Sequence, residues 1–172
     1  SQDRNVAATF QATPSYALSV TRSGSGTVAS TPAGINCGTD CSESYPSGTD
    51  VSLTATPATG YAFSGWSGAC TGTGTCSLTM AAAKSVTATF KALTKYTLTV
   101  KRSGSGTVTS SPTGITCGSD CSEAYYSGTV VTLTAVPATG YKFSGWSGAC
   151  TGTGACTLTM TATKTATATF KR

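Results

Sequence analysis

The chain repeats itself at a fixed offset of 80 residues, and this duplication restricts the fold more than any other feature of the sequence. Residues 16–90 align with residues 96–170 without a gap, and most of the paired positions are identical. A repeat of this length can form a small domain with its own core, whereas solenoid repeats of about 20 to 50 residues bury their apolar faces only against neighbouring repeats. The sequence therefore predicts two tandem domains.

The duplication also sets the expected domain boundaries. Val6 and Phe10 stand one period before Val86 and Phe90, so the array extends in front of the first complete repeat. We expect the last strand of a preceding repeat at 1–10, a linker at 11–15, the first repeat at 16–90, a second linker at 91–95 and the second repeat at 96–172.

Alternation of apolar and small polar residues predicts strands throughout each repeat. In the segment YALSVTR, Tyr16, Leu18 and Val20 fall on one face, which is the period of a half-buried strand. No segment shows helical periodicity over ten residues, and glycine-containing turns separate the alternating runs. The sequence predicts an all-β fold, or one nearly so, with about five or six strands per repeat. The segment 32–48 has no such period and is expected to be an irregular loop.

Cysteines occur four to a repeat at identical spacing: Cys37, Cys41, Cys70, Cys76, Cys117, Cys121, Cys150 and Cys156. Domains this small often need covalent staples, and an even number of cysteines indicates disulfides formed in an oxidising compartment. Zinc is the alternative, but its structural sites favour a CxxC spacing that is absent here. Three pairings per repeat are open. We expect local pairing, because a turn brings such cysteines close enough, with bridges between the two loops as the alternative.

Composition excludes several classes of function. Only 10% of the residues are charged, and the Lys and Arg residues are scattered rather than clustered as nucleic-acid binding requires. No apolar run approaches the roughly 18 residues of a membrane span. The chain has no histidine and no nucleophile motif, so we expect no enzyme activity, no catalytic residue and no cofactor.

The few carboxylates offer only a weak case for a metal site. Asp40 and Glu43 lie three residues apart in the cysteine-containing loop, and Asp120 and Glu123 repeat the pair. With loop carbonyls they could assist a Ca²⁺ ion. An aspartate in such a loop more often caps a turn through its own backbone, so we expect no metal.

The aromatic residues have two interpretations, core packing and ligand contact. Tyr61 and Phe63 alternate in phase, but strict alternation would place Trp66 on the opposite face, so we expect a bulge at Gly65 that turns the indole inward. A domain this small needs its tryptophan in the core, although exposed rings would suit a sugar-binding platform. In the irregular loop, Tyr45, Tyr125 and Tyr126 are expected to form an exposed contact surface.

The motifs GTV, GTxVxLTAxPATGYxFSGW, CTLTM and TATF occur in this order in each repeat, CTLTM reading CSLTM in the first. Together they resemble the divergent relatives of the internalin B B-repeat, a module found in tandem on bacterial cell-surface and secreted proteins. The resemblance covers almost all of both repeats. It implies a small, elongated, β-grasp-like sheet, an extracellular or envelope setting and no catalysis. The four cysteines depart from the plainest form of that family and match its disulfide-bearing variants.

A near-identical copy supplies reach and multivalency rather than a second active site. We therefore expect a non-catalytic structural spacer of a bacterial cell-surface or secreted protein, located outside the cell, whose partners are neighbouring repeats. Self-association is a further expectation, with residues 4–10 adding as a strand to another molecule and building a fibre. The alternative is a carbohydrate-binding or adhesive module, accessory to an extracellular enzyme or adhesin, with a polysaccharide as its partner.

Overall fold

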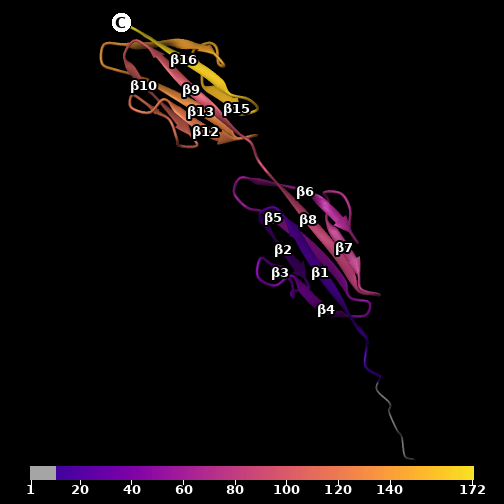
Figure 1. Ribbon diagram of the computed structural model, residues 1–172. Helices are drawn as coiled ribbons and strands as arrows, with labels where there is room; N and C mark the ends of the chain where they lie inside the picture. The colour runs from indigo at the N-terminus through magenta and orange to yellow at the C-terminus, as the bar shows by residue number, and fades with distance from the viewer. Residues whose placement is uncertain (1–10) are drawn as a thin grey trace, which may run out of the picture. The chain divides into compact units, whose positions relative to one another are not determined.

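A computed structural model describes residues 11–172, which form two compact units that divide between Ala92 and Leu93 (Figure 1). Within these residues the secondary structure consists of strands, turns and bends without any helix. The strand expected at residues 1–10 lies outside the described part of the chain.

The first unit contains eight strands in two four-stranded sheets. One sheet has the order β4-β1-β8-β6 and the other the order β3-β2-β5-β7. The strands are β1 (Ser15–Ser23), β2 (Gly26–Thr31), β3 (Asn36–Cys37), β4 (Ser42–Pro46), β5 (Asp50–Pro57), β6 (Tyr61–Gly68), β7 (Cys76–Thr79) and β8 (Lys84–Ala92).

The second unit repeats this topology, with sheets β12-β9-β16-β14 and β11-β10-β13-β15. Its strands are β9 (Lys95–Ser103), β10 (Gly106–Ser111), β11 (Thr116–Cys117), β12 (Ser122–Tyr126), β13 (Val130–Pro137), β14 (Lys142–Gly148), β15 (Cys156–Thr159) and β16 (Lys164–Lys171).

The predicted all-β class, the two tandem domains and the two disulfides per domain are confirmed. The strand count is eight rather than five or six, because the segment 32–48, expected to be irregular, contributes β3 and β4. These strands are two and five residues long, too short for a clear alternation in sequence.

The first and last strands of each unit lie side by side. In the first unit β1 pairs in parallel with β8 from Leu18 opposite Lys84 to Ser23 opposite Thr89, and β4 pairs antiparallel on the other side of β1. Between β1 and β2, the turn at Gly24 crosses close to Phe90 of β8 and carries the chain from one sheet to the other. The pairing of its first strand with its last strand thus holds the two ends of the unit in one sheet.

One core fills each unit and takes side chains from both of its sheets. In the first unit the members with less than 10% exposure are Leu18, Val20, Val28, Ile35, Cys37, Tyr45, Val51, Leu53, Trp66, Cys76, Leu78, Met80, Val86, Ala88 and Phe90, and the second unit repeats the set. The expected bulge lies between Phe63 and Gly65, where the register of β6 against β8 shifts. It turns the indole of Trp66 inward, leaving the side chain 6% exposed.

The connection between the units is short. β8 ends at Ala92 and β9 begins at Lys95, so Leu93 and Thr94 alone separate the two strands, where the sequence predicted a linker over 91–95. Strands β8 and β9 therefore each extend into the segment 91–95 that the repeat alignment assigned to the linker.

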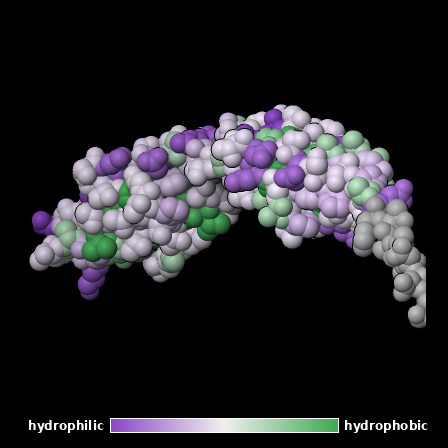
Figure 2. All heavy atoms as spheres, turned by 90° about the horizontal axis from the view of Figure 1, so that it is seen from below, coloured by the Kyte–Doolittle hydropathy of each residue, from purple (hydrophilic) through white to green (hydrophobic). Residues whose placement is uncertain are grey.

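Small hydroxyl and methyl groups cover much of the outer surface. On the first unit the outward positions of β1 and β8 are Ala17, Ser19, Thr21, Ser85, Thr87 and Thr89. Figure 2 shows a mostly pale surface, with hydrophilic residues spread over both units and only small separate hydrophobic areas. Threonine suits such faces, because its branched side chain fits a pleated strand while its hydroxyl meets water.

Candidate functional site

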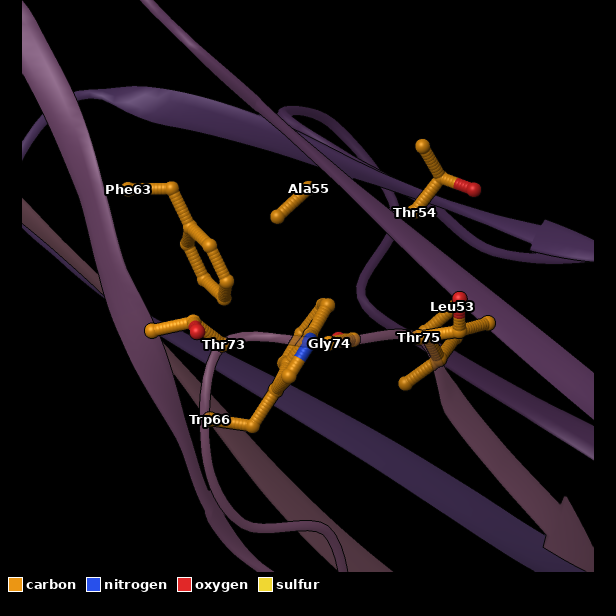
Figure 3. Close-up of a pocket in the computed structure, with 8 residues that line it drawn as sticks. All are labelled: Leu53, Thr54, Ala55, Phe63, Trp66, Thr73, Gly74 and Thr75. Carbon is orange, nitrogen blue, oxygen red and sulfur yellow. Dashed lines mark hydrogen bonds between the residues drawn. The ribbon is translucent and has the colours of Figure 1, made fainter.

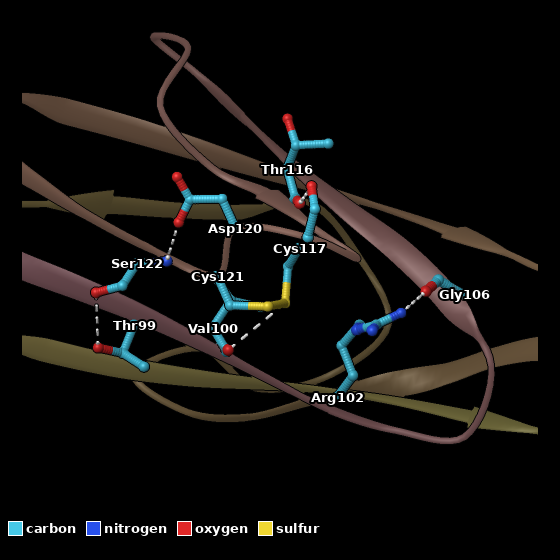
Figure 4. The surroundings of a disulfide bond; sticks show 10 residues. Thr99, Val100, Arg102, Gly106, Thr116, Cys117, Asp120, Cys121 and Ser122 are labelled. Atoms are coloured by element: carbon cyan, nitrogen blue, oxygen red, sulfur yellow. Dashed lines mark hydrogen bonds between the residues drawn. A yellow bond between two sulfur atoms is a disulfide. The ribbon is translucent and has the colours of Figure 1, made fainter.

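The eight cysteines form four local disulfides. Cys37 bonds to Cys41 and Cys70 bonds to Cys76, with Cα–Cα distances of 4.2 and 5.6 Å. The second unit has the same pairs, and Figure 4 shows the bridge between Cys117 and Cys121 next to the backbone carbonyl of Val100. Among residues 11–172 no cysteine is free, and no group of three or more His, Cys, Asp or Glu side chains is placed to hold a metal. All eight sulfurs are thus held in disulfides.

A hollow of about 350 Å³ lies beside the second disulfide loop of the first unit, and one of about 240 Å³ occupies the same place in the second unit. Figure 3 shows the rings of Phe63 and Trp66 at this hollow, meeting edge to face with centroids 5.0 Å apart. The indole Nε1 donates a 2.9 Å hydrogen bond to the carbonyl of Gly74, which fixes the loop against β6. The other lining residues are Leu53, Thr54, Ala55, Thr73 and Thr75. None of these side chains can act as an acid or base near neutral pH.

Two of the three tyrosines expected at an exposed contact surface are buried instead. Tyr45 is 4% exposed and Tyr125 is 7% exposed, because the segment around each is a strand whose alternate residues face the core. The Tyr45 hydroxyl lies 2.7 Å from the hydroxyl of Ser30, which also accepts a hydrogen bond from the amide of Ile35. Sequence reasoning missed Ser30, although its place in the alternation of β2 marks it as inward.

Tyr126 is the remaining candidate from that surface. It follows Tyr125 in β12, so its side chain points to the opposite face, where it is half-buried. The ammonium group of Lys95 lies 4.7 Å from the centre of its ring, in the geometry of a cation–π contact. The first unit has Pro46 at the equivalent position, so the two repeats differ here.

The carboxylates of the cysteine-containing loops accept hydrogen bonds from nearby backbone amides. Asp40 Oδ1 accepts a 3.2 Å hydrogen bond from the amide of Ser42, and Glu43 Oε1 accepts a 2.7 Å bond from the amide of Ser44. Asp120 and Glu123 do the same in the second unit (Figure 4 shows the Asp120 contact). These groups stabilise the polypeptide locally and leave no cluster for a cation within residues 11–172.

The Tyr125 phenol is expected to contribute to the pH dependence of the second unit's stability. Burial raises its pKa above the ordinary value of 10.0, the hydrogen bond with Ser110 lowers it, and the charges of Glu123 and Asp120 add to the rise. The pKa of Tyr125 is higher in the folded than in the unfolded chain, so its neutral phenol favours the folded state. This contribution to the unfolding free energy is complete below a pH of about 10 and is lost as the pH rises further. Tyr125→Phe should therefore flatten the alkaline fall in unfolding free energy, measured by urea titration at several pH values. An unchanged slope would contradict this assignment.

No helix long and apolar enough to cross a membrane occurs within residues 11–172.

A profile of the family described as "Divergent InlB B-repeat domain" matches residues 16–94 and again residues 96–172. No curated protein matches the chain. Solved structures with detectable similarity include the shaft pilin SpaA from Lactobacillus rhamnosus GG, which is 10% identical, with 94% of this chain and 99% of that chain covered and a TM-score of 0.33. A double mutant of that pilin is 9% identical at the same coverage and TM-score. Similarity this low carries no conclusion about function, so the assignment depends on the family profile.

Proposed function

The chain belongs to the divergent InlB B-repeat family, and from this membership we propose that its two units are non-catalytic structural spacers of a bacterial cell-surface or secreted protein. Two observations together carry the proposal. Each unit has its own core, and the two cores are nearly identical. Only Leu93 and Thr94 lie between the last strand of the first unit and the first strand of the second. So short a connection restricts the separation between neighbouring units, so that each added unit contributes a similar rise.

The side chains around the two hollows beside the indoles support a non-catalytic role. The two recurring hollows beside Trp66 and Trp146 are lined by threonine, alanine, glycine, leucine and aromatic side chains. A hydrolytic or transfer reaction needs an acid, a base or a nucleophile at the reacting atoms. The disulfides in turn favour an oxidising, extracellular location, because cytosolic thiols are kept reduced.

Burial of the indoles favours the spacer over the alternative of polysaccharide binding. A platform for sugar rings needs an open aromatic face, and Trp66 and Trp146 are each only 6% exposed. Phe63 and Phe143 are the more accessible rings at the two hollows, and each leans against its neighbouring indole and a further phenylalanine. Packing within the unit accounts for this aromatic group without a ligand.

Small-angle X-ray scattering tests the spacer role. We expect the maximum dimension of a four-unit chain, made by joining two copies of residues 11–172, to exceed that of the two-unit chain by about the length of two units. A matched four-unit chain with long Gly/Ser linkers in place of the short connections should show a broader distance distribution, because flexible linkers behave as random coils. A maximum dimension that does not grow with unit number would contradict the proposal.

A further inference from the structure

The outer edge of β4, the side that does not pair with β1, carries the backbone groups of every second residue. The amide of Val20 donates to the carbonyl of Cys41, and the amide of Ser47 donates to the carbonyl of Pro14. In an antiparallel ladder the residues that bond to one neighbour alternate with those that face away. The odd-numbered residues of β4 therefore bond to β1, while positions 42, 44 and 46 direct their backbone groups outward.

In the first unit this edge offers no free amide donor. Asp40 accepts the hydrogen bond of the Ser42 amide, Glu43 accepts that of the Ser44 amide, and Pro46 has no amide hydrogen. Unpaired edges are the places where a strand from another molecule adds to a sheet, and charged side chains and proline are common means of closing them. The β4 edge thus has no amide donor available at any of its three outward positions.

The second unit keeps the first two closures and lacks the third. Asp120 and Glu123 accept hydrogen bonds from the amides of Ser122 and Ala124 at 3.2 and 2.8 Å. Tyr126 replaces the proline, and within residues 11–172 its outward amide makes no hydrogen bond. The carbonyls of Ser122 and Ala124 lie on the same edge. One donor and two acceptors are therefore available to an added strand.

A hollow of about 300 Å³ adjoins this edge. Its lining residues are Pro112, Thr113, Glu123, Ala124, Tyr125, Tyr126 and Thr129. An added strand uses its backbone for affinity and places alternate side chains in such recesses for specificity. The hollow lies beside the open amide, so both requirements are met in one place.

We propose that the β12 edge at Tyr126 binds residues 4–10 of a second copy of this chain as an added strand. This segment alternates Val6, Ala8 and Phe10 as β8 alternates Val86, Ala88 and Phe90, so it has the pattern of a strand with one apolar face. That face supplies side chains for the hollow, and Arg4 supplies a positive charge for an edge that carries Asp120 and Glu123. The inference deepens the proposed structural role by naming the surface through which the chain assembles.

The two repeats provide matched variants for the test, since Pro46 and Tyr126 occupy equivalent positions of the same fold. Sedimentation equilibrium would compare the full chain with Tyr126→Pro, Pro46→Tyr and the double exchange. We expect the average mass of the full chain to rise with concentration. Tyr126→Pro should weaken association by about tenfold, which is the effect of one lost hydrogen bond. Pro46→Tyr should strengthen association. The double exchange should restore association through the first unit. Equal association of the full chain and Tyr126→Pro would overturn the proposal.

Two further variants separate the amide from the ring and identify the added segment. Tyr126→Ala keeps the amide hydrogen and should associate within about threefold of the full chain, because the backbone makes the contact. A loss as large as that of Tyr126→Pro would count against the edge. Deletion of residues 1–10 should leave a monomer, and association that persists would rule out the named segment. A full chain that stays monomeric also overturns the proposal, while the scattering test of the spacer role is independent of it.

Discussion

Alanine in place of Trp66 is expected to unfold the first unit and leave the second folded. The indole is 6% exposed, it packs edge to face on Phe63, and its Nε1 holds the loop at Gly74. Removing a buried tryptophan costs about 3–5 kcal/mol, which is most of the stability of a domain of this size. The effect stays local because the buried residues of each unit form a separate core.

Hydrogen exchange read by mass spectrometry measures this result unit by unit. In Trp66→Ala, peptides from residues 16–90 should lose their protection while peptides from residues 96–172 keep theirs. The remaining indole, Trp146, reports the second unit by its fluorescence during urea unfolding, and Trp146→Ala is the mirror-image control. Loss of protection throughout the chain in either variant would contradict the independence of the two cores.

Gly24→Ala is expected to destabilise the first unit by about 3 kcal/mol. Gly24 has a φ of +83°, and a Cβ added there would lie 2.0 Å from the backbone carbonyl oxygen of Phe90. A left-handed conformation costs a residue with a side chain about 1–2 kcal/mol, and forcing atoms into a packed site costs about 1–3 kcal/mol more. Phe90 lies in β8, an inner strand of its sheet, and pairs with Phe63 of β6, so its carbonyl cannot move aside without disturbing that pairing.

Two other glycines separate the strain from the collision. Gly72 has a φ of +81° with open space around it, so Gly72→Ala should lose only about 1 kcal/mol from the backbone strain. Gly74 has neither a positive φ nor a close neighbour, so Gly74→Ala should stay within about 0.5 kcal/mol of the unaltered chain. Urea unfolding of the three variants gives the order, and equal losses at Gly24 and Gly72 would show that the turn has room for a methyl group.

Alternation accounts for what the sequence predicted well. The tandem organisation followed from the offset of 80, and the inward positions of Leu18 and Val86 followed from the period of two. The bulge before Trp66 was predictable because an apolar ring out of phase requires one extra residue in the strand. The period and the bulge are local features that a single segment contains, and the tandem organisation needs only a comparison of the sequence with itself.

Features that depend on contacts between distant segments could not be read in this way. The short strand β4 carries Tyr45, and only its pairing with β1 and the hydroxyl of Ser30 shows that this ring is inward. Asp40 and Glu43 accept hydrogen bonds from neighbouring amides. That these bonds occupy amides at a sheet edge becomes clear only once β4 is known to be the outermost strand of its sheet. Sequence spacing alone presented the same carboxylates as a candidate cation site.

The parallel pairing of β1 with β8 determines how a unit responds to tension. The chain enters the unit at the start of β1 and leaves it at the end of β8, so a pull on the two termini drives these strands past each other along their length. The backbone hydrogen bonds across the six paired positions from Leu18 to Ser23 are then loaded together in shear, and they do not break one after another. Stretching such a chain meets its greatest resistance before the first strand has separated.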